Sequence, residues 1–331
     1  MGVKHALVTG GAGFIGFHLS RRLLMQGWRV TCVDDLSTGS MDNAQTLMSR
    51  YPINYVWYNA DIREDLCWLE EQYAVVYNLA SPASPMRYVD CPIKTIESNV
   101  VGVANVLEVA QRDSAILVQA STSEVYGDPT EHPQSERYWG NVNPIGQRSC
   151  YDEGKRAAEA MVSAYRYERG VEGRVVRIFN TYGPRMRLDD GRVVCSFIRN
   201  ALDGVPLRIH GNGGQTRSFC YVDDTVRALV LAGEPWIDWP EAVNVGNPHE
   251  ISIRQLADEV LSLVGGAPDS VEFEPAPIAD DPRRQCPDIR LAKEVLGWMP
   301  KVGLREGLIE TLEYYMSGAD VDRRKDANEL D

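Results

Sequence analysis

The stretch Ala6-Leu7-Val8-Thr9-Gly10-Gly11-Ala12-Gly13-Phe14-Ile15-Gly16 decides the fold of this chain. Its apolar start is typical of a buried strand, and helical periodicity follows from His18 to Met25. Glycines between a strand and a helix allow a tight turn, a close approach of the backbone to a ligand and close packing of the helix. The N–H groups at the start of such a helix bind phosphate groups. The stretch therefore predicts a dinucleotide site at the end of the first strand.

Apolar runs alternate with helical patterns along the first 180 residues. Strands without polar alternation that are separated by helices predict a parallel sheet that is covered on both faces. The fold class that we expect is α/β, a Rossmann-type doubly wound parallel sheet with a smaller C-terminal α/β domain. After the first strand and helix, the expected strands are 30–33, 75–79, 116–120 and 174–178, and the expected helices are 95–111, 152–169, 253–264 and 305–316.

Charge and cysteine content exclude several classes of protein. The 331 residues contain 34 Lys and Arg against 47 Asp and Glu, a formal net charge of −13, which argues against a nucleic-acid or anionic-membrane partner. The 7 cysteines never form a C-x-x-C motif, so we expect neither a disulfide framework nor a metal site. No apolar run approaches the ~18 residues of a membrane span, and Met1 leads directly into a strand without room for a signal peptide. We therefore expect a cytoplasmic protein.

Acidic residues follow the second and third expected strands. Asp34 ends the second strand, where a carboxylate accepts hydrogen bonds from the adenosine ribose and repels a 2′-phosphate. NAD is therefore favoured over NADP, although a turn or a helix cap is an alternative role for Asp34-Asp35. Asp61-Ile62 comes just past a further expected strand, between 30–33 and 75–79, and would flank the adenine, with a helix N-cap as the alternative.

Tyr151 and Lys155 form the only Tyr-x-x-x-Lys motif of the chain. On a helix, this spacing places the phenol and the ammonium group on one face. An adjacent cation lowers the pKa of tyrosine from about 10, which lets the phenolate take an alcohol proton near neutral pH. The ordinary start of an amphipathic helix is the alternative, but the glycine turn upstream favours catalysis.

Hydroxyl and acidic residues, Ser121-Thr122-Ser123-Glu124, come directly after a buried strand. Open α/β sheets bind their ligands at this carboxyl edge. Thr122 is expected to bind the alcohol that Tyr151 deprotonates, and Glu124 to act as an acid, a base or a water-orienting group. A turn with a solvated glutamate is the alternative.

Longer runs resemble the extended short-chain dehydrogenase/reductase family, specifically its UDP-glucuronate decarboxylases (UDP-xylose synthases). The resemblance covers about residues 4–315, and the runs that carry it are 79–85, 121–129, 143–156, 177–186 with 190–194, and 214–219. It implies a cycle on NAD in which Tyr151 takes the proton of the sugar 4-hydroxyl of UDP-glucuronate while C4 is oxidised. The resulting β-keto acid then loses CO₂, and re-reduction at C4 gives UDP-xylose.

The motifs and the resemblance together predict three groups of site residues. The catalytic group is Thr122, Ser123, Glu124, Tyr151 and Lys155. The cofactor group is Gly10, Gly13, Phe14, Ile15, Gly16, Asp34, Asp35, Thr38, Gly39, Asp61, Ile62, Leu79, Ala80, Asn99, Tyr151 and Lys155. The substrate group is Pro82, Ser84, Asn180, Arg185, Arg192, Arg217 and Gln285. Paired arginines beside glycine-rich loops are also the expected way for an acidic protein to hold a diphosphate, with a solvated surface as the alternative.

Two positions depart from the pattern of the resembling family. That family usually has Lys where this chain has Glu97, near the substrate, and Arg where it has Gln285. Fewer cations would hold the intermediate after CO₂ has left, so we expect some UDP-4-keto-pentose to escape beside UDP-xylose. Arg283 or Arg284 would compensate if the loop shifts.

Two other functions remain open. A nucleotide-sugar 4,6-dehydratase or an epimerase shares the C4 oxidation, but dehydratases commonly carry Asp-Glu after the threonine, whereas this chain has Ser123-Glu124. A catalytically silent NAD-binding sensor is less favoured, because a sensor needs neither the Tyr-Lys pair nor the Thr-Ser-Glu run.

The resemblance also implies a homodimer, in which helices equivalent to about 95–111 and 152–169 form a four-helix bundle with their symmetry mates. Burial within one subunit is the alternative for the apolar residues of these segments, which are Val100, Val101, Val103, Val106, Leu107, Ala157, Met161 and Ala164.

Two domains and a tail are expected along the chain. The NAD-binding domain is expected over 1–180 and about 217–247, and the nucleotide-sugar-binding domain over 181–216 and 248–317. The charged tail 318–331 has few apolar residues, so we expect it to be disordered.

Overall fold

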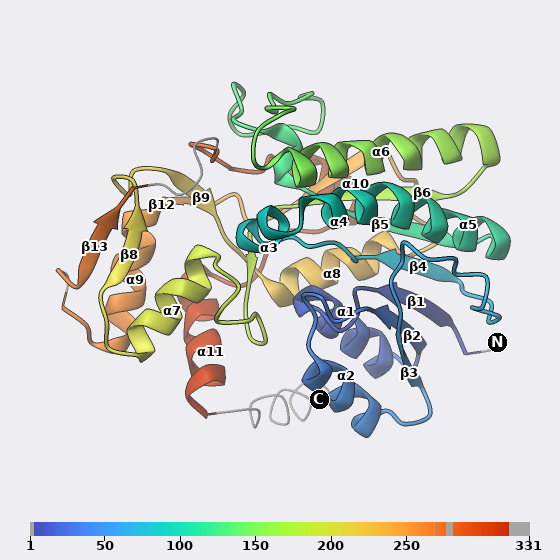
Figure 1. The fold of residues 1–331 in the computed structure, drawn as a ribbon, viewed down its shortest axis with the longest axis horizontal. Helices are drawn as coiled ribbons and strands as arrows, with labels where there is room; N and C mark the ends of the chain where they lie inside the picture. The colour runs from blue at the N-terminus through green and yellow to red at the C-terminus, as the bar shows by residue number, and fades with distance from the viewer. Residues whose placement is uncertain (1–2, 268, 276–280, 318–331) are drawn as a thin grey trace.

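A seven-stranded, all-parallel sheet occupies the centre of the larger part of the molecule, in the order β11-β6-β5-β4-β1-β2-β3 (Figure 1). The order reverses between β1 and β4, so the carboxyl ends of these strands flank the point where such sheets bind ligands. The strands of this sheet are β1 His5–Thr9, β2 Arg29–Asp34, β3 Tyr55–Asn59, β4 Val75–Asn78, β5 Ile116–Thr122, β6 Gly173–Ile178 and β11 Ala242–Val245.

The computed structural model describes residues 3–267, 269–275 and 281–317, so the tail expected to be disordered, 318–331, lies outside the described residues. Within these ranges, no helix has the length and hydrophobicity that crossing a membrane requires. The helices are α1 Phe14–Met25, α2 Met41–Arg50, α3 Pro85–Asp90, α4 Pro92–Glu97, α5 Val103–Asp113, α6 Ser149–Arg169, α7 Val193–Leu202, α8 Val222–Ala232, α9 Ile253–Val264, α10 Arg290–Leu296 and α11 Leu304–Ser317.

Both faces of the sheet are apolar, as the uninterrupted apolar strands predict. Ala6 and Val8 of β1 pack in one core with Phe17 of α1, whereas Leu7 packs in the opposite core with Val106 of α5. Figure 1 shows α1 and α8 on one face of the sheet and α4, α5 and α6 on the other. Burying one such side chain contributes roughly 1.5–3 kcal/mol, so the two layers hold the sheet in place.

The helix expected over 95–111 is interrupted. α4 ends at Glu97, a π-helical turn covers Ser98–Gly102, and α5 begins at Val103. The π-turn contains a buried amide, Asn99, whose Nδ2 donates to Ser81 Oγ at 3.0 Å and to the carbonyl of Thr95 at 2.9 Å. Gly154 of α6 lies against it, since a Cβ at this glycine would be 3.2 Å from Asn99 Cβ. Such turns occur frequently at functional sites.

A smaller set of elements follows β6, at the left of Figure 1. Three two-stranded sheets pair β7 Thr181–Tyr182 with β10 Cys220–Tyr221, β8 Leu207–His210 with β13 Val271–Glu274, and β9 Thr216–Ser218 with β12 Glu250–Ser252. Apolar residues of α7 and α9 share one core with α1 and α8. Because this core is continuous, the domain boundaries stay a prediction.

Candidate active site

The glycine turn leaves the N-terminus of α1 open to a ligand. Gly13 is the N-cap residue and makes no side-chain cap. A Cβ at Gly16 would lie 2.7 Å from Gly11 Cα, and one at Gly10, whose φ is +70°, would lie 2.8 Å from the backbone N of Ala80. No larger residue fits at either position. The turn thus brings a strand end, a helix start and the residue after Leu79 together, and helix N-termini of this kind bind phosphate groups.

Asp34 ends β2 at the same edge and is 7% exposed. Its carboxylate accepts hydrogen bonds from the backbone N–H groups of Ala12 (3.0 Å) and Leu36 (2.8 Å). Burial nevertheless raises the pKa of Asp34 to about 6. Gly39 closes over it, since a Cβ there would be 2.7 Å from Asp34 Oδ1. The loop that carries Thr38 and Gly39 therefore lies beside the carboxylate that is predicted to hold ribose.

The other acidic residues of this region form ion pairs with basic side chains. Asp35 accepts a hydrogen bond from Lys94 at 2.6 Å, and both oxygens of Asp61 accept from Arg63. Arg63 also pairs with Glu97. Glu97 thus shares one guanidinium with Asp61, and the expectation that it reduces the positive charge near the substrate stays a prediction.

Tyr151 and Lys155 lie on the first turns of α6, buried against the end of β5, and are 5% and 4% exposed. Burial raises the pKa of Tyr151 to about 12, against the opposing effects of the Thr122 hydroxyl and the charge of Arg192. Lys155 Nζ donates to the carbonyl of Ala120 at 2.9 Å and lies 5.9 Å from the Tyr151 ring centroid. Burial lowers the pKa of Lys155 to about 8.

The expected lowering of the Tyr151 pKa by Lys155 is therefore not found in the chain alone. Desolvation penalises the phenolate more than neighbouring groups stabilise it. The cation that acts on Tyr151 is Arg192, which precedes α7.

A second tyrosine that the sequence analysis missed supports the site. Tyr88 of α3 is 1% exposed and stacks on Tyr151, with ring centroids 4.9 Å apart and an interplanar angle of 2°. The preceding residues place Pro82 and Ser84 nearby, and Ser84 Oγ donates to the carbonyl of Asp190. No local sequence pattern links Tyr88 to Tyr151, because α3 and α6 meet only in the folded chain.

Glu124 stands between three polar partners. Its backbone N–H donates to Thr122 Oγ1 at 3.3 Å, and its carboxylate accepts from Arg148 and, at 2.8 Å, from Gln285 Nε2. Gln285 Oε1 in turn accepts from Asn180 at 3.2 Å. Although burial opposes it, Arg148 and then Gln285 hold the pKa of Glu124 below its usual value. Ser123, 3% exposed, lies beside it.

Two of the predicted substrate arginines act on the proposed catalytic residues, Arg217 on Glu124 and Arg192 on Tyr151. Arg217 of β9 donates to Asp281 Oδ2 at 2.7 Å, and its charge acts on Glu124. Arg192 pairs with Asp190 at 3.3 Å. Arg283 and Arg284 are both exposed, and the compensation expected from them if the loop shifts stays a prediction.

Arg185 departs from the prediction. Its guanidinium donates to Asn43 Oδ1 at 2.7 Å and lies 4.1 Å from the Phe17 ring centroid, so the side chain is packed against α1 and α2. Its guanidinium also lies 6.0 Å from the Tyr314 ring centroid, and the backbone φ at Arg185 is +64°. A substrate contact for Arg185 is not supported by this geometry.

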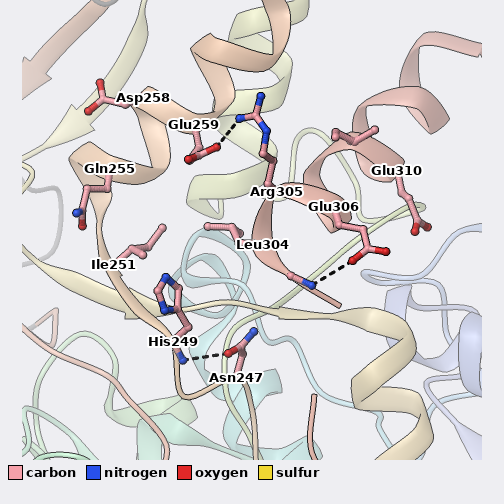
Figure 2. Close-up of a pocket in the computed structure, with 12 residues that line it drawn as sticks. Asn247, His249, Ile251, Gln255, Asp258, Glu259, Leu304, Arg305, Glu306 and Glu310 are labelled. Carbon is pink, nitrogen blue, oxygen red and sulfur yellow. Dashed lines mark hydrogen bonds and ion pairs between the residues drawn. The ribbon is translucent and has the colours of Figure 1, made fainter. Parts of the chain in front are cut away.

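A cavity of about 950 Å³ lies elsewhere, between α9 and α11 (Figure 2). Acidic side chains surround it, and one of them, Glu259, pairs with Arg305 at 2.8 Å. None of the predicted site residues lines this cavity. Its size therefore does not mark the site that the sequence predicts.

One family model, described as the NAD dependent epimerase/dehydratase family, matches residues 6–246. The chain belongs to this family. The matched range contains the glycine turn, Asp34, the Thr122–Glu124 run and the Tyr151–Lys155 pair. The cofactor of the family, as its description states, is NAD.

Curated relatives support a narrower resemblance. UDP-glucuronic acid decarboxylase 1 of Xenopus tropicalis is 50% identical over 312 residues, which cover 94% of this chain and 72% of the relative. UDP-glucuronic acid decarboxylase 6 of Arabidopsis thaliana is 50% identical over 303 residues, which cover 91% of this chain and 86% of the relative. The resemblance inferred from the sequence motifs is thus confirmed.

Solved structures of nucleotide-sugar epimerases share the fold. UDP-glucose 4-epimerase of Thermotoga maritima with UDP-glucose has a TM-score of 0.85 and 31% identity, with 95% of this chain and 99% of that chain covered. UDP-glucuronic acid 4-epimerase of Bacillus cereus in complex with UDP-glucuronic acid and NAD has a TM-score of 0.85 and 27% identity, with the same coverage of 95% and 99%. The predicted Rossmann-type α/β class is confirmed.

Proposed function

We propose that the chain is an NAD-dependent enzyme that decarboxylates UDP-glucuronate to UDP-xylose through a 4-keto intermediate. The observation that carries the proposal is the 50% identity, over 94% of the chain, to a UDP-glucuronic acid decarboxylase. The arrangement of Thr122, Glu124 and Tyr151 at one sheet edge supports the same chemistry.

The residues present fit NAD. The glycine turn and the open N-terminus of α1 would hold the pyrophosphate, and Asp34 the adenosine ribose. Asn99 Oδ1 is buried without a hydrogen-bond partner beside the buried Lys155 helix, which suits the nicotinamide ribose. When bound, NAD supplies an acceptor for the C4 hydride and returns it at the end of the cycle. The other proposed contacts are Gly10, Gly13, Phe14, Ile15, Gly16, Asp35, Thr38, Gly39, Asp61, Ile62, Leu79, Ala80, Tyr151 and Lys155.

Tyr151 is the proposed base for the sugar 4-hydroxyl. Thr122 would bind the same oxygen and stabilise the phenolate, and Arg192 would contribute its positive charge. Tyr151 takes this proton only as the phenolate, which burial disfavours and which the Thr122 hydroxyl and the charge of Arg192 favour.

Loss of CO₂ follows from the oxidation at C4. A ketone at C4 makes the C5 carboxylate a β-keto acid, whose C–C bond electrons pass into the enolate. Glu124 and Ser123 would line this side of the site and orient the group that protonates C5. Return of the hydride to C4, with the proton from Tyr151, completes UDP-xylose.

Arg192, Arg217 and Asn180 are the proposed ligands of the diphosphate, with Gln285, Pro82 and Ser84 toward the sugar. Without a ligand, Arg217 donates a hydrogen bond to Asp281 Oδ2 at 2.7 Å. A diphosphate would compete with that carboxylate for the guanidinium, since Arg–phosphate contacts are strong and bidentate.

An epimerase that acts on UDP-glucuronate is the second candidate. The likeness to the Bacillus cereus UDP-glucuronic acid 4-epimerase favours it, but the identity is only 27%, against 50% to the decarboxylases.

Incubating the chain with UDP-glucuronate and NAD distinguishes the two functions. A decarboxylase yields CO₂ and a pentose nucleotide, an epimerase yields UDP-galacturonate, and a silent NAD-binding protein yields neither. Tyr151→Phe is the matched inactive control.

We also propose that two copies of the chain pair through α5 and α6. Val103, Val106 and Leu107 are buried within the subunit, so they are not available for this contact, contrary to the expectation. Val101, which is 45% exposed, and the exposed Ala164 remain on the proposed face. Symmetric dimers are the commonest soluble oligomers.

A cytoplasmic location of the protein stays a prediction.

A further inference from the structure

Both carboxylate oxygens of Glu124 are held. Gln285 Nε2 donates to Oε1 at 2.8 Å, and Arg148 Nη2 donates to Oε2. The side chains of Glu124 and Arg148 are 15% and 4% exposed, and Gln285 is 2% exposed. A carboxylate fixed at both ends inside the protein has one orientation, and that orientation is set by these two donors.

Arg148 is itself fixed by other elements. It is the last residue before α6, where its Nη1 donates to Asp281 Oδ1 at 2.7 Å and its Nε lies 3.8 Å from Asp152 Oδ2. Arg148 thus joins the loop of Asp281 and the start of the Tyr151 helix to Glu124. A guanidinium buried against three acidic side chains keeps its charge.

The remaining groups near Glu124 do not replace this contact. Arg217 acts on Glu124 through its charge, but its guanidinium donates to Asp281 and to the backbone of Thr216. Burial raises the pKa of both Tyr88 and Tyr151, and neither phenol supplies a positive charge to Glu124. Gln285 adds a hydrogen bond without a charge. Within residues 3–267, 269–275 and 281–317, the one cation that contacts Glu124 is Arg148.

We propose that Arg148 is a positioning residue for Glu124, which it keeps ionised and turned toward the sugar, while the neutral Gln285 fixes the second oxygen. This inference rests on the proposed function. A carboxylate held in this way accepts hydrogen bonds, so it orients the water that delivers a proton to C5 instead of donating its own.

The test compares the pH profile of kcat for CO₂ release in three variants. Arg148→Gln removes the charge, Arg148→Lys keeps the charge without the forked contact, and Arg174→Lys is the control. Arg174 is a fully buried arginine at the opposite end of β6 that donates to the carbonyl of Ala232 at 2.8 Å. It therefore reports the general cost of altering a buried arginine.

Arg148→Gln is expected to move the acid limb of kcat upward by about one pH unit or more, because Glu124 loses its cation. It is expected to lower kcat by about 10²-fold, with the affinity for UDP, measured by calorimetry, largely retained. Arg148→Lys should return the acid limb of the kcat profile to the pH of the unmodified chain and recover part of kcat. Arg174→Lys should not move the acid limb. An unmoved acid limb in Arg148→Gln, or a loss that falls on UDP binding instead of kcat, overturns the inference.

Thermal unfolding separates this inference from the proposed function. The pKa of Glu124 is lowered on folding, so its pairing with Arg148 stabilises the chain above the unfolded glutamate pKa and is lost as the pH falls through the folded value. Arg148→Gln should therefore have a lower melting temperature than the unmodified chain at neutral pH, and this difference should shrink toward acidic pH. The expectation holds even if the unmodified chain releases no CO₂. A melting-temperature difference that does not change with pH contradicts the ion pair of Arg148 with Glu124. Absence of CO₂ release contradicts only the proposed function.

Discussion

At the scale of single residues, Asp34 is expected to make the affinity for NAD depend on pH. Burial raises its pKa to about 6, and its oxygens already accept two backbone hydrogen bonds. A ribose diol needs further acceptors, so NAD binds the ionised carboxylate and competes with its protonation. We expect the NAD dissociation constant to be flat above this pKa and to rise about tenfold per pH unit below it.

Calorimetry of NAD binding across this range checks the prediction. Asp34→Asn should remove the pH dependence and relax the preference against NADP, because the amide neither titrates nor repels a 2′-phosphate. Asp61→Asn is the comparison, since the pKa of Asp61 is held low by Arg63 against the effect of burial, so this variant keeps the pH slope. Equal affinities of the unmodified chain for NAD and NADP would show that Asp34 does not select the cofactor.

Gln285 sets a second prediction at this scale, the partition of products. It bonds to Glu124 and Asn180 where the resembling family carries an arginine. A charge-assisted hydrogen bond is worth roughly 1.5–3 kcal/mol, enough to change a dissociation rate about tenfold or more. We expect Gln285→Arg to raise the fraction of UDP-xylose over released UDP-4-keto-pentose, as measured by chromatography. If the unmodified chain releases only UDP-xylose, Gln285 does not limit retention.

The sequence predicts individual site residues unevenly. Tyr151 and Lys155 are four positions apart, so helical spacing alone places them on one face. Arg148 contacts Glu124 across 24 positions and Gln285 contacts it across 161, and no local pattern encodes those distances. The pKa of Tyr151 also has no local pattern, because desolvation depends on the packed surroundings.

At the scale of elements, the glycine turn before α1 makes the clearest prediction. A Cβ at Gly16 would collide with the backbone of Gly10 and Gly11, and backbone cannot move aside as a flexible side chain does. Gly16→Ala should therefore force the turn apart, lower the melting temperature and weaken NAD binding by about tenfold or more.

Gly303→Ala is the control for that variant, since a Cβ at Gly303 meets no atom within 4 Å. Differential scanning fluorimetry with and without NAD measures both quantities. Gly16→Ala that retains the NAD affinity of the unmodified chain would mean that the pyrophosphate does not bind at this turn.

The elements themselves are predicted best where the pattern is local. β1 and β2 follow from short apolar runs, and α9 from its periodicity, its capping box at Ser252 and Gln255, and its terminal Gly265. The π-turn at Ser98–Gly102 has no such signature. Its place depends on Asn99 meeting Ser81 and Gly154, which lie on other segments.

At the scale of the whole molecule, the proposed dimer predicts a measurable mass. Light scattering at micromolar concentration should give twice the chain mass. Val101→Asp should lower it, because a charge in the π-turn that leads into α5 would be buried in the proposed interface. Ile53→Asp is the control, since Ile53 is 84% exposed in the connection between α2 and β3. A monomeric mass for the unmodified chain would rule the dimer out.

The most direct test of the central claim follows the carboxyl carbon of the substrate. UDP-glucuronate labelled with ¹³C at C6 is incubated with the chain and NAD in D₂O, and the products are followed by NMR. The account predicts labelled CO₂ and an unlabelled UDP-pentose that carries deuterium at C5. UDP-galacturonate that retains the label, or unchanged substrate beside a chain that binds NAD, would contradict the assignment of this site to decarboxylation.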